Sequence, residues 1–302
     1  MTNNRVLVAL LNADQEFQQL QAADARAAAT RLGLSAEIVF AEGHAVVQIQ
    51  QLFSHVHAEP ASRPDAILVE SVTGEGLQRV ARNAAGAGIG WILLNTRVPY
   101  IEELRKAYPA LPFSLVSGNQ TEVGCIQARQ CLTLLPGLSR VLVIQGPADT
   151  TVASERLAGL ERELGPRGVS CKVIDGTWTE QSAEKSVTSW LRLKTADAFR
   201  PAAVLCQNDS MAVGARRAIL SARPDWTDIP FLGCDGLPDG GQRLVRQGDL
   251  AATVVIPSNT GPALELLSAY FTKGRMPPHE VLLSPVSYPP EKELARRSPA
   301  DR

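Results

Sequence analysis

Long apolar runs are missing from this chain of 302 residues, and so is any excess of charge. No stretch approaches the ~20 apolar residues that a helix needs to cross a bilayer, so we expect no membrane insertion. The formal net charge of −1 offers no binding surface to nucleic acid or to an anionic membrane. Aromatic residues make up only 5% of the chain. We therefore expect a soluble protein without a nucleic-acid partner, in which each well-placed Phe or Trp is informative.

The sequence gives only weak evidence for the cellular compartment, because we find neither paired cysteines nor a signal peptide in it. The five cysteines are an odd number and include no Cys-x-x-Cys pair. We expect all five to be reduced and buried, which favours a reducing compartment. Residues 1–5 lead directly into an apolar run that is too short for an export signal. The protein is thus expected to be periplasmic if an export leader preceded Met1 and was removed, and cytoplasmic otherwise.

Motifs for catalysis and metal binding are absent too. His55 and His57 are two residues apart, so their side chains diverge on a helix and make a poor metal pair. No serine lies in a Gly-x-Ser-x-Gly elbow. The glycine-rich run 85–90 follows a helix, whereas a dinucleotide-binding loop follows a strand, and the loop at 145–156 lacks the Gly-Lys-Ser/Thr of a P-loop. We expect no enzyme, no cofactor and no metal site.

The chain does contain a regular alternation of strand-like and helix-like segments, which restarts near residue 118. With this length, the alternation predicts an α/β protein built from two doubly wound parallel-sheet lobes, and the short junction at 117–119 predicts strand crossovers with a cleft between the lobes. The expected strands are Val6–Leu11, Ala36–Phe40, Ala66–Glu70, Trp91–Asn95, Phe113–Ser117, Arg140–Gln145, Ser170–Ile174, Ala203–Cys206, Phe231–Cys234, Ala251–Ile256 and Val281–Val286. The expected helices are Leu20–Leu32, Val46–His57, Leu77–Ala87, Val123–Leu135, Glu155–Leu164, Ser182–Leu193, Met211–Ala222, Gly240–Gln247 and Pro262–Lys273.

A polar tripeptide, Gln207-Asn208-Asp209, follows one of these strands directly and precedes a helix. Open α/β sheets hold their ligands outside the carboxyl ends of their strands, so this corner is placed to hold a small polar molecule. We expect Asn208 to contact the ligand, and Asp209 or Ser210 to cap the helix.

Two aromatic residues lie in loops that follow strands. Phe17 lies after the first strand, and Trp178 after the strand at 170–174. Each can press on the apolar face of a sugar ring while polar groups bond its hydroxyls. Packing beneath its own loop explains either residue equally well when it is taken alone. Arg156, one turn into its helix, either leans towards a ligand or lies in solvent.

Several motifs occur in the order found in a known family. The chain resembles the periplasmic sugar-binding proteins of the ribose-binding type, whose fold is shared with the effector domains of lac-repressor-like regulators. The similarity runs from Val6 to about Val286. The motifs that carry it are Gln207–Gly214, Gly233–Gly240, Gly248–Thr253, and Gln145–Ala148 with Glu155-Arg156.

This resemblance implies two lobes joined by a three-crossover hinge that closes over a ligand in the cleft between them, without catalysis. The N-terminal lobe would comprise residues 1–117 with 257–284, and the C-terminal lobe residues 118–256 with 285–302. Phe17 and Trp178 would stack on the ligand, and arginine, amide and acid side chains would bond its hydroxyls. The ligand-binding residues that it implies are Asn12, Asp14, Phe17, Thr96, Arg97, Arg156, Trp178, Asn208 and Asp235.

Departures from the family pattern bear on the ligand. Thr96 stands where the family has an aspartate before Arg97, so one charge-assisted acceptor is missing. Cys234 stands before Asp235, where an aromatic residue is common, and the apolar run 254–256 replaces a polar position. These differences point away from a simple aldopentose or aldohexose and towards a modified sugar, a polyol or another small polar ring. The two arginines also allow an acidic group on the ligand.

The leading hypothesis is a solute-binding protein that captures a sugar-like or polyol-like ligand for ABC-type uptake or signalling. Its macromolecular partner would be a membrane permease or a sensor protein. The alternative is a cytosolic effector-sensing domain of a lac-repressor-like regulator that lacks its DNA-binding helix-turn-helix. The unpaired thiols favour the alternative, and the motifs of the site fit both.

Overall fold

The computed structural model describes residues 4–74, 76–135, 140–193, 196 and 198–295. The chain divides into two compact units, each built on its own six-stranded sheet. Unit 1 comprises Met1–Gly118 and Ser258–Leu283, and unit 2 comprises Asn119–Pro257 and Ser284–Arg302. The chain passes from one unit to the other three times, and each boundary lies within one residue of the lobe boundary expected from the sequence. The expected α/β architecture of two parallel-sheet lobes is confirmed.

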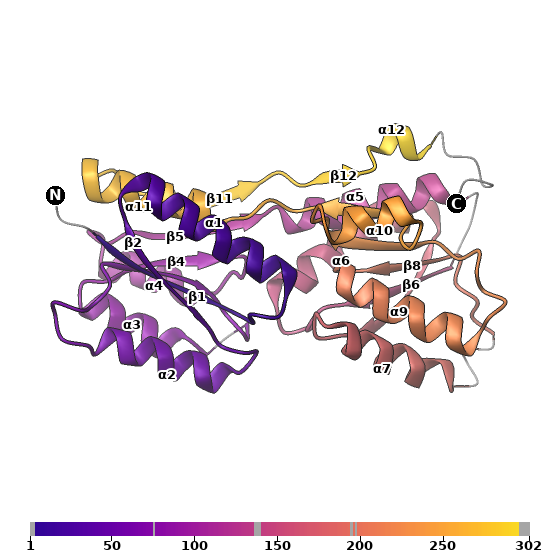
Figure 1. Ribbon diagram of the computed structural model, residues 1–302, viewed down its shortest axis with the longest axis horizontal. Coiled ribbons are helices and arrows are strands. Elements are labelled where there is room, and N and C mark those ends of the chain that lie inside the picture. Colours follow the sequence, from indigo (N-terminus) through magenta and orange to yellow (C-terminus); the bar gives the residue numbers. More distant parts are fainter. Residues whose placement is uncertain (1–3, 75, 136–139, 194–195, 197, 296–302) are drawn as a thin grey trace. The chain divides into compact units, whose positions relative to one another are not determined.

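The sheet of unit 1 has the strand order β11-β5-β4-β3-β1-β2 and is parallel throughout. Helices α1 and α11 cover one face, and α2, α3 and α4 cover the other (Figure 1). The strands are β1 Arg5–Leu10, β2 Ser35–Phe40, β3 Ala66–Glu70, β4 Gly90–Leu94, β5 Phe113–Gly118 and β11 Glu280–Leu283. The helices are α1 Glu16–Leu32, α2 Ala45–Val56, α3 Gln78–Gly86, α4 Tyr100–Ala107 and α11 Thr260–Lys273.

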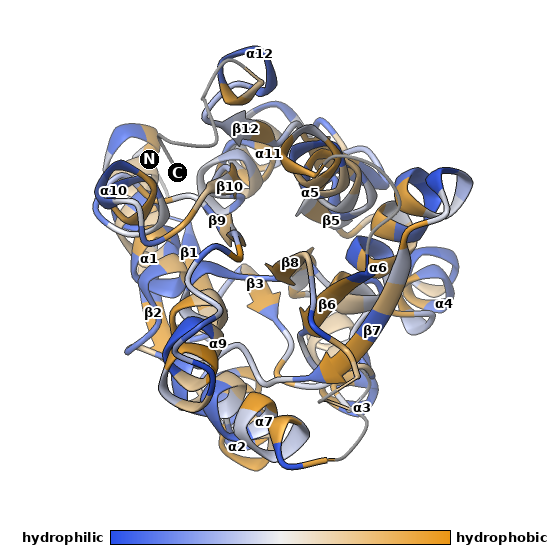
Figure 2. Ribbon diagram, turned by 90° about the vertical axis from the view of Figure 1, so that its right-hand side faces the viewer, coloured by the Kyte–Doolittle hydropathy of each residue, from blue (hydrophilic) through white to orange (hydrophobic). Residues whose placement is uncertain are grey.

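The sheet of unit 2 has the order β12-β10-β9-β8-β6-β7, and only β12 runs antiparallel to its neighbour among the described pairs. Figure 2 shows β6 and β8 largely in hydrophobic colours, as expected for strands covered on both faces, whereas the edge strand β7 is mixed in colour and only partly buried. The strands are β6 Arg140–Gln145, β7 Ser170–Asp175, β8 Ala203–Cys206, β9 Phe231–Asp235, β10 Ala252–Val255 and β12 Val286–Tyr288. The helices are α5 Gln120–Leu134, α6 Thr151–Leu164, α7 Glu180–Leu191, α9 Asp209–Ala222, α10 Gly241–Gln247 and α12 Glu291–Leu294, with a 3₁₀ turn at Gly165–Arg167.

Two glycines set the spacing between α5 and α6. A Cβ atom on Gly124 would lie 2.0 Å from the backbone oxygen of Arg156, and one on Gly159 would lie 2.1 Å from the backbone oxygen of Thr121. Only glycine allows the two helix backbones to approach this closely. The contact fixes the first turns of α6, and with them the position of Arg156.

The C-terminal segment differs from the sequence expectation. The single strand expected over Val281–Val286 is wrong: β11 pairs with β5 in unit 1, and β12 pairs with β10 in unit 2. Pro285 lies between the two strands, and its missing N–H cannot take part in a strand ladder. The short helix α4 was also not expected from the sequence.

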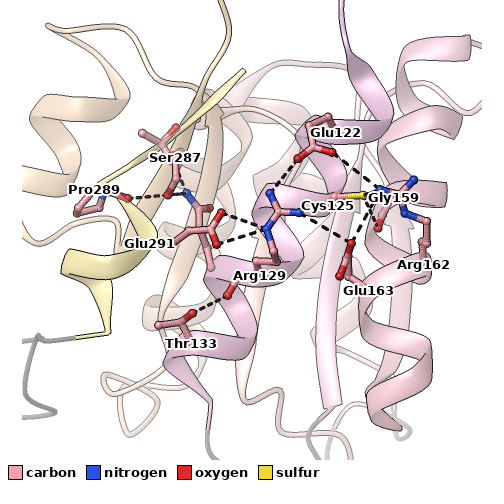
Figure 3. Close-up of polar contacts among 12 residues, drawn as sticks. Glu122, Cys125, Arg129, Thr133, Gly159, Arg162, Glu163, Ser287, Pro289 and Glu291 are labelled. Atoms are coloured by element: carbon pink, nitrogen blue, oxygen red, sulfur yellow. Dashed lines mark hydrogen bonds and ion pairs between the residues drawn. The ribbon is translucent and has the colours of Figure 1, made fainter. Parts of the chain in front are cut away.

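An ionic cluster joins the segment after β12 to α5 (Figure 3). Arg129 of α5 donates to Glu122 on its own helix at 2.9 Å and to Glu291 of α12 at 3.1 Å. Ser287 adds a second link, because its hydroxyl accepts from Gln130 of α5 at 2.9 Å. The last strand and helix of unit 2 are therefore tied to α5 by side chains as well as by strand pairing.

Candidate functional site

Positive backbone φ angles mark the carboxyl ends of three strands. Among the described non-glycine residues, Asn95, Trp178 and Asp235 have φ angles of 60°, 65° and 96°, and they lie at or just beyond the ends of β4, β7 and β9. A fourth such residue, Glu42, lies in the turn before α2. Because this conformation costs free energy, most of all for a side chain as large as tryptophan, its use at these strand ends marks candidate functional loops in each unit.

Arg156 is buried at the carboxyl edge of the unit 2 sheet, with 6% of its surface exposed. Its Nε donates to Gln120 Oε1 at 2.8 Å, and its Nη1 donates to the backbone oxygen of Gln207. Its Cζ lies 5.5 Å from the centroid of the Trp178 ring, which is within the range of a cation–π interaction. The sequence left open whether Arg156 leans back over the loop or lies in solvent; it does not lie in solvent, and its contact with a ligand stays a prediction.

Trp178 is partly buried and packs against the core of unit 2. Its ring lies against the backbone of Gly146, where a Cβ atom would lie 2.1 Å from ring atoms Cη2 and Cζ2. Its backbone oxygen accepts from Asn208 Nδ2 at 2.9 Å. Residues that follow β6 and β8 therefore both contact this one residue of the loop after β7.

The Gln207-Asn208-Asp209 corner differs from the expectation in one respect. Asn208, not Asp209 or Ser210, caps α9, because its Oδ1 accepts from Met211 N at 2.8 Å. Asp209 instead accepts from Gly236 N at 2.8 Å and from Thr253 Oγ1 at 2.7 Å. Its expected capping role was wrong because its partners lie just after β9 and within β10, which sequence proximity does not reveal.

Gln207 ties the loop after β8 to the loop after β6 and to the first turn of α6. Its Oε1 accepts from Gly146 N at 2.9 Å, and its Nε2 donates to the backbone oxygen of Ala153 at 3.0 Å. The sequence expectation gave a ligand contact to Asn208 and no role to Gln207 or Gly146. The available signal for Gln207 was its place between an apolar strand and a helix, and the structure shows it fully buried.

Asp235 ends β9 and is partly buried beside the fully buried thiol of Cys234. Burial raises the pKa of the Cys234 thiol well above its usual range, and the nearby Arg156 charge opposes that shift. The thiol is therefore an inert apolar filler beneath the site rather than a nucleophile.

In unit 1, the loop after β1 carries three predicted site residues. Asn12 Oδ1 accepts from Asp14 N at 2.9 Å, which fixes the turn before α1. Asp14 is exposed and Phe17, in the first turn of α1, is partly exposed. All three are accessible at the carboxyl end of β1.

A buried polar network that sequence analysis missed holds these loops. The Glu70 carboxylate at the end of β3 accepts from Gln21 at 2.6 Å, from Asn95 at 2.9 Å and from Gln18 at 3.1 Å. Gln18 Oε1 in turn accepts from Leu11 N at 3.0 Å. The network therefore connects the ends of β1, β3 and β4 through side chains.

Thr96 and Arg97 follow Asn95 in different environments. Thr96 is buried, whereas Arg97 is partly exposed and pairs with Glu280 of β11. Asn95 also accepts from Asn259 Nδ2 at 2.8 Å, which connects this loop to the start of α11. The ligand-binding roles of all nine predicted residues stay predictions.

The side chains at these strand ends offer hydrogen-bonding groups and aromatic faces. Within the described ranges, no group of three or more His, Cys, Asp or Glu side chains is arranged to hold a metal ion. None of the helices in the described part of the chain is long and apolar enough to span a membrane. Arg156, Asn208 and Asp235 supply hydrogen-bonding groups, and Trp178 and Phe17 supply aromatic faces.

Comparison with known proteins agrees with this geometry. The family model described as "periplasmic binding protein domain" matches residues 6–260. A putative rhizopine-binding protein of Rhizobium meliloti is 26% identical over 59% of this chain and 56% of its own length. The ribose import binding protein RbsB of Salmonella typhimurium is 33% identical over 41% of this chain and 40% of its own. The chain thus matches only about half of each of these two relatives.

Solved structures match over nearly the full chain. The myo-inositol binding protein of Caulobacter, bound to myo-inositol, superposes with a TM-score of 0.81 at 19% identity, covering 98% of this chain and 96% of that one. A galactofuranose binding protein gives a TM-score of 0.82 at 22% identity, covering 97% of both chains. At these identities the likeness establishes the fold.

Proposed function

The chain belongs to the periplasmic binding protein domain family, and we propose that it is a solute-binding protein that captures a sugar-like small polar ligand for ABC-type uptake or signalling. A membrane permease or a sensor protein would be its partner. The relatives described above are named as binding proteins, which favours solute capture over gene regulation and over catalysis.

The pairing of the buried Arg156 with the partly buried Trp178 is the observation that carries this proposal. A guanidinium group with 6% exposure bonds to neutral oxygens and lies near an aromatic face, at the edge where parallel sheets bind ligands. Aromatic faces bind the C–H face of a sugar ring, and a guanidinium fork bonds adjacent hydroxyls. Both groups are held in place by the protein before any ligand arrives.

We propose that the remaining ligand contacts come from residues at the carboxyl ends of the other strands. Phe17 would give a second aromatic face, and Arg97 would exchange its Glu280 partner for ligand oxygens. Further polar contacts would come from Asn12, Asp14, Thr96, Asn208 and Asp235. Because Thr96 replaces an acidic residue, we favour a polyol or a modified sugar over a simple aldose.

Export to the periplasm is proposed from family membership. The genomic reading frame upstream of Met1 tests it. An in-frame signal peptide supports export, whereas an in-frame helix-turn-helix segment would identify a regulator instead.

Ligand capture is tested in two steps. Small molecules that remain bound through purification are identified by mass spectrometry after denaturation. A calorimetric and thermal-shift screen then covers myo-inositol, D-ribose, D-galactose and D-glucuronate. We expect one compound to raise the unfolding temperature, because a ligand that binds only the folded state stabilises it by mass action.

Arg156→Lys is expected to weaken this response. Its matched control is Arg140→Lys, because Arg140 also lies over an aromatic ring, at 5.2 Å from Phe199, but at the amino end of β6. If no sugar, polyol or sugar acid stabilises the wild-type protein, the proposed function is wrong.

A further inference from the structure

Trp178 is held by contacts from two loops other than its own, and we propose that Gly146 and Asn208 are positioning residues that set the place of its ring and, through it, the fit of a ring-shaped ligand. Only the second part of this inference, the fit of a ring-shaped ligand, rests on the proposed function. The position of the ring is a property of the ligand-free protein.

Gly146 provides the space that the indole occupies. A Cβ atom there would lie 2.1 Å from Cη2 and Cζ2 and 2.5 Å from Cε2 of Trp178. These are atoms of a rigid ring, so the indole would have to move as a whole. The φ angle of Gly146 is not in the left-handed region, so an alanine would be tolerated there were it not for the ring. Gly146 is thus required for the position of a side chain that lies 32 residues further along the sequence.

Asn208 holds the backbone beneath the ring. Its Nδ2 donates to the Trp178 oxygen at 2.9 Å while its Oδ1 caps α9. Trp178 has a φ angle of 65°, which a bulky residue adopts only under constraint. The bond from Asn208 holds the backbone of Trp178 itself, whereas the neighbouring residues Gly176 and Thr177 are held by bonds to Gln145 and Ser182. One amide side chain therefore couples a helix cap to the strained aromatic loop.

Arg156 completes the arrangement from a third side. Its guanidinium carbon lies 5.5 Å from the ring centroid, and its Nη1 donates to the backbone oxygen of Gln207, next to Asn208. Any shift of the indole alters the environment of the buried guanidinium. Gly146 and Asn208 therefore act on two proposed ligand contacts through one ring.

The chain offers substitutions that separate these roles. Asn208→Asp keeps an oxygen to cap α9 but replaces the donor to Trp178 with an oxygen that repels it. Asn119→Asp is its matched control, because Asn119 caps α5 by accepting from Glu122 N at 3.1 Å. Gly146→Ala is compared with Gly165→Ala, since a Cβ on Gly165 would have no neighbour within 4 Å.

Fluorine NMR of the ligand-free protein, labelled with 5-fluorotryptophan, tests the positioning. The chain has four tryptophans, and Trp178→Phe assigns the resonance of interest. We expect Gly146→Ala and Asn208→Asp to shift that resonance and to raise acrylamide quenching, while the two controls leave both unchanged. An unshifted Trp178 resonance in a folded Asn208→Asp protein overturns the proposal, even if Gly146→Ala fails to fold.

Binding of the strongest stabiliser among the four screened sugars tests the second part. We expect Gly146→Ala to weaken its affinity roughly tenfold in the wild-type background and less than about twofold in a Trp178→Ala background, because residues that act through one another are not additive. Equal losses in both backgrounds would contradict action through Trp178. Failure of the wild-type protein to bind any of the four compounds counts against the proposed function, whereas the fluorine resonances still decide the positioning.

Discussion

Arg129 donates from Nε to both carboxylate oxygens of Glu291, at 3.1 and 3.3 Å, and so attaches the short helix α12 to α5 across 162 positions of sequence. Its Nη2 is occupied by Glu122 at 2.9 Å (Figure 3). A guanidinium group shared by several carboxylates is better ordered than an isolated surface pair.

Removal of the Glu291 charge should loosen the end of unit 2. We expect Glu291→Gln to lower the free energy of unfolding by about 1 kcal/mol, since a partly exposed pair within a network lies at the upper end of surface ion pairs. Glu293→Gln, two residues on and exposed, should have no effect. Urea unfolding at low and high salt measures both. If the difference in unfolding free energy between the two variants grew with salt concentration, the loss in Glu291→Gln would not be ionic in origin.

The buried Asp209 carboxylate is expected to be a main support of the unit 2 sheet edge. Thr253→Val keeps the shape of the side chain but removes the hydroxyl that donates to Asp209 at 2.7 Å. We expect a loss of about 1.5–3 kcal/mol, the range for a hydrogen bond to a charged group. Thr227→Val, at an exposed position, is the control. Equal unfolding midpoints for the two variants would show that the bond adds nothing.

Glu70 is expected to be equally important in unit 1. In Glu70→Gln, the new side-chain N–H must face N–H donors that point at the carboxylate in the wild-type protein. One of these donors is Gln21 Nε2, at 2.6 Å from the carboxylate. We expect a loss of about 2 kcal/mol, with faster hydrogen exchange at the Leu11 amide, which depends on Gln18. Glu265→Gln, which removes a surface ion pair, is the control. Unchanged exchange at Leu11 would contradict a network that reaches the loop after β1.

The buried thiols should be unreactive in the native protein. Burial raises the pKa of Cys131 to about 12, and burial also raises those of Cys206 and Cys234. Because the thiolate is the reactive form, Cys131 should react with iodoacetamide at pH 8 roughly a thousandfold more slowly than a free thiol. Its rate should rise with pH until the raised pKa is reached.

Mass spectrometry of peptides after brief alkylation tests this expectation. Cys171, the partly exposed thiol, should be modified first, and all five cysteines should react in urea. Rapid native modification of Cys206 or Cys234 would contradict the packing at the site. Unreactive thiols also remove the sequence argument for a reducing compartment, because buried cysteines persist in either compartment.

Strands could be predicted from the sequence more readily than the contacts that build the site. Runs such as Ala203–Cys206 are apolar throughout because helices cover both faces of the sheet, and this pattern is local. The partners of Asp209 lie 27 and 44 residues away, and the ring that rests on Gly146 lies in another loop. No local pattern marks such pairs.

The same reasoning explains why the C-terminal strand was predicted wrongly and why the network around Glu70 was not predicted. Val281 and Val286 look alike in sequence, yet one pairs with β5 and the other with β10. Gln18 and Gln21 look like solvent-facing residues of an amphipathic helix until the Glu70 carboxylate is found beneath them. Buried amides of this kind are identified by their partners rather than by their own residue type.

Because the chain passes three times between its units, the order of synthesis on the ribosome also determines when each unit can complete its fold. Unit 1 lacks its edge strand β11 and its helix α11 until residues 258–283 have emerged, and unit 2 lacks β12 and α12 until the residues that follow have emerged. Neither unit can therefore complete its fold before these late segments have been made. A discontinuous domain plan of this kind postpones the final folding step of both halves until the same stretch of the nascent chain, residues 258–294, is available.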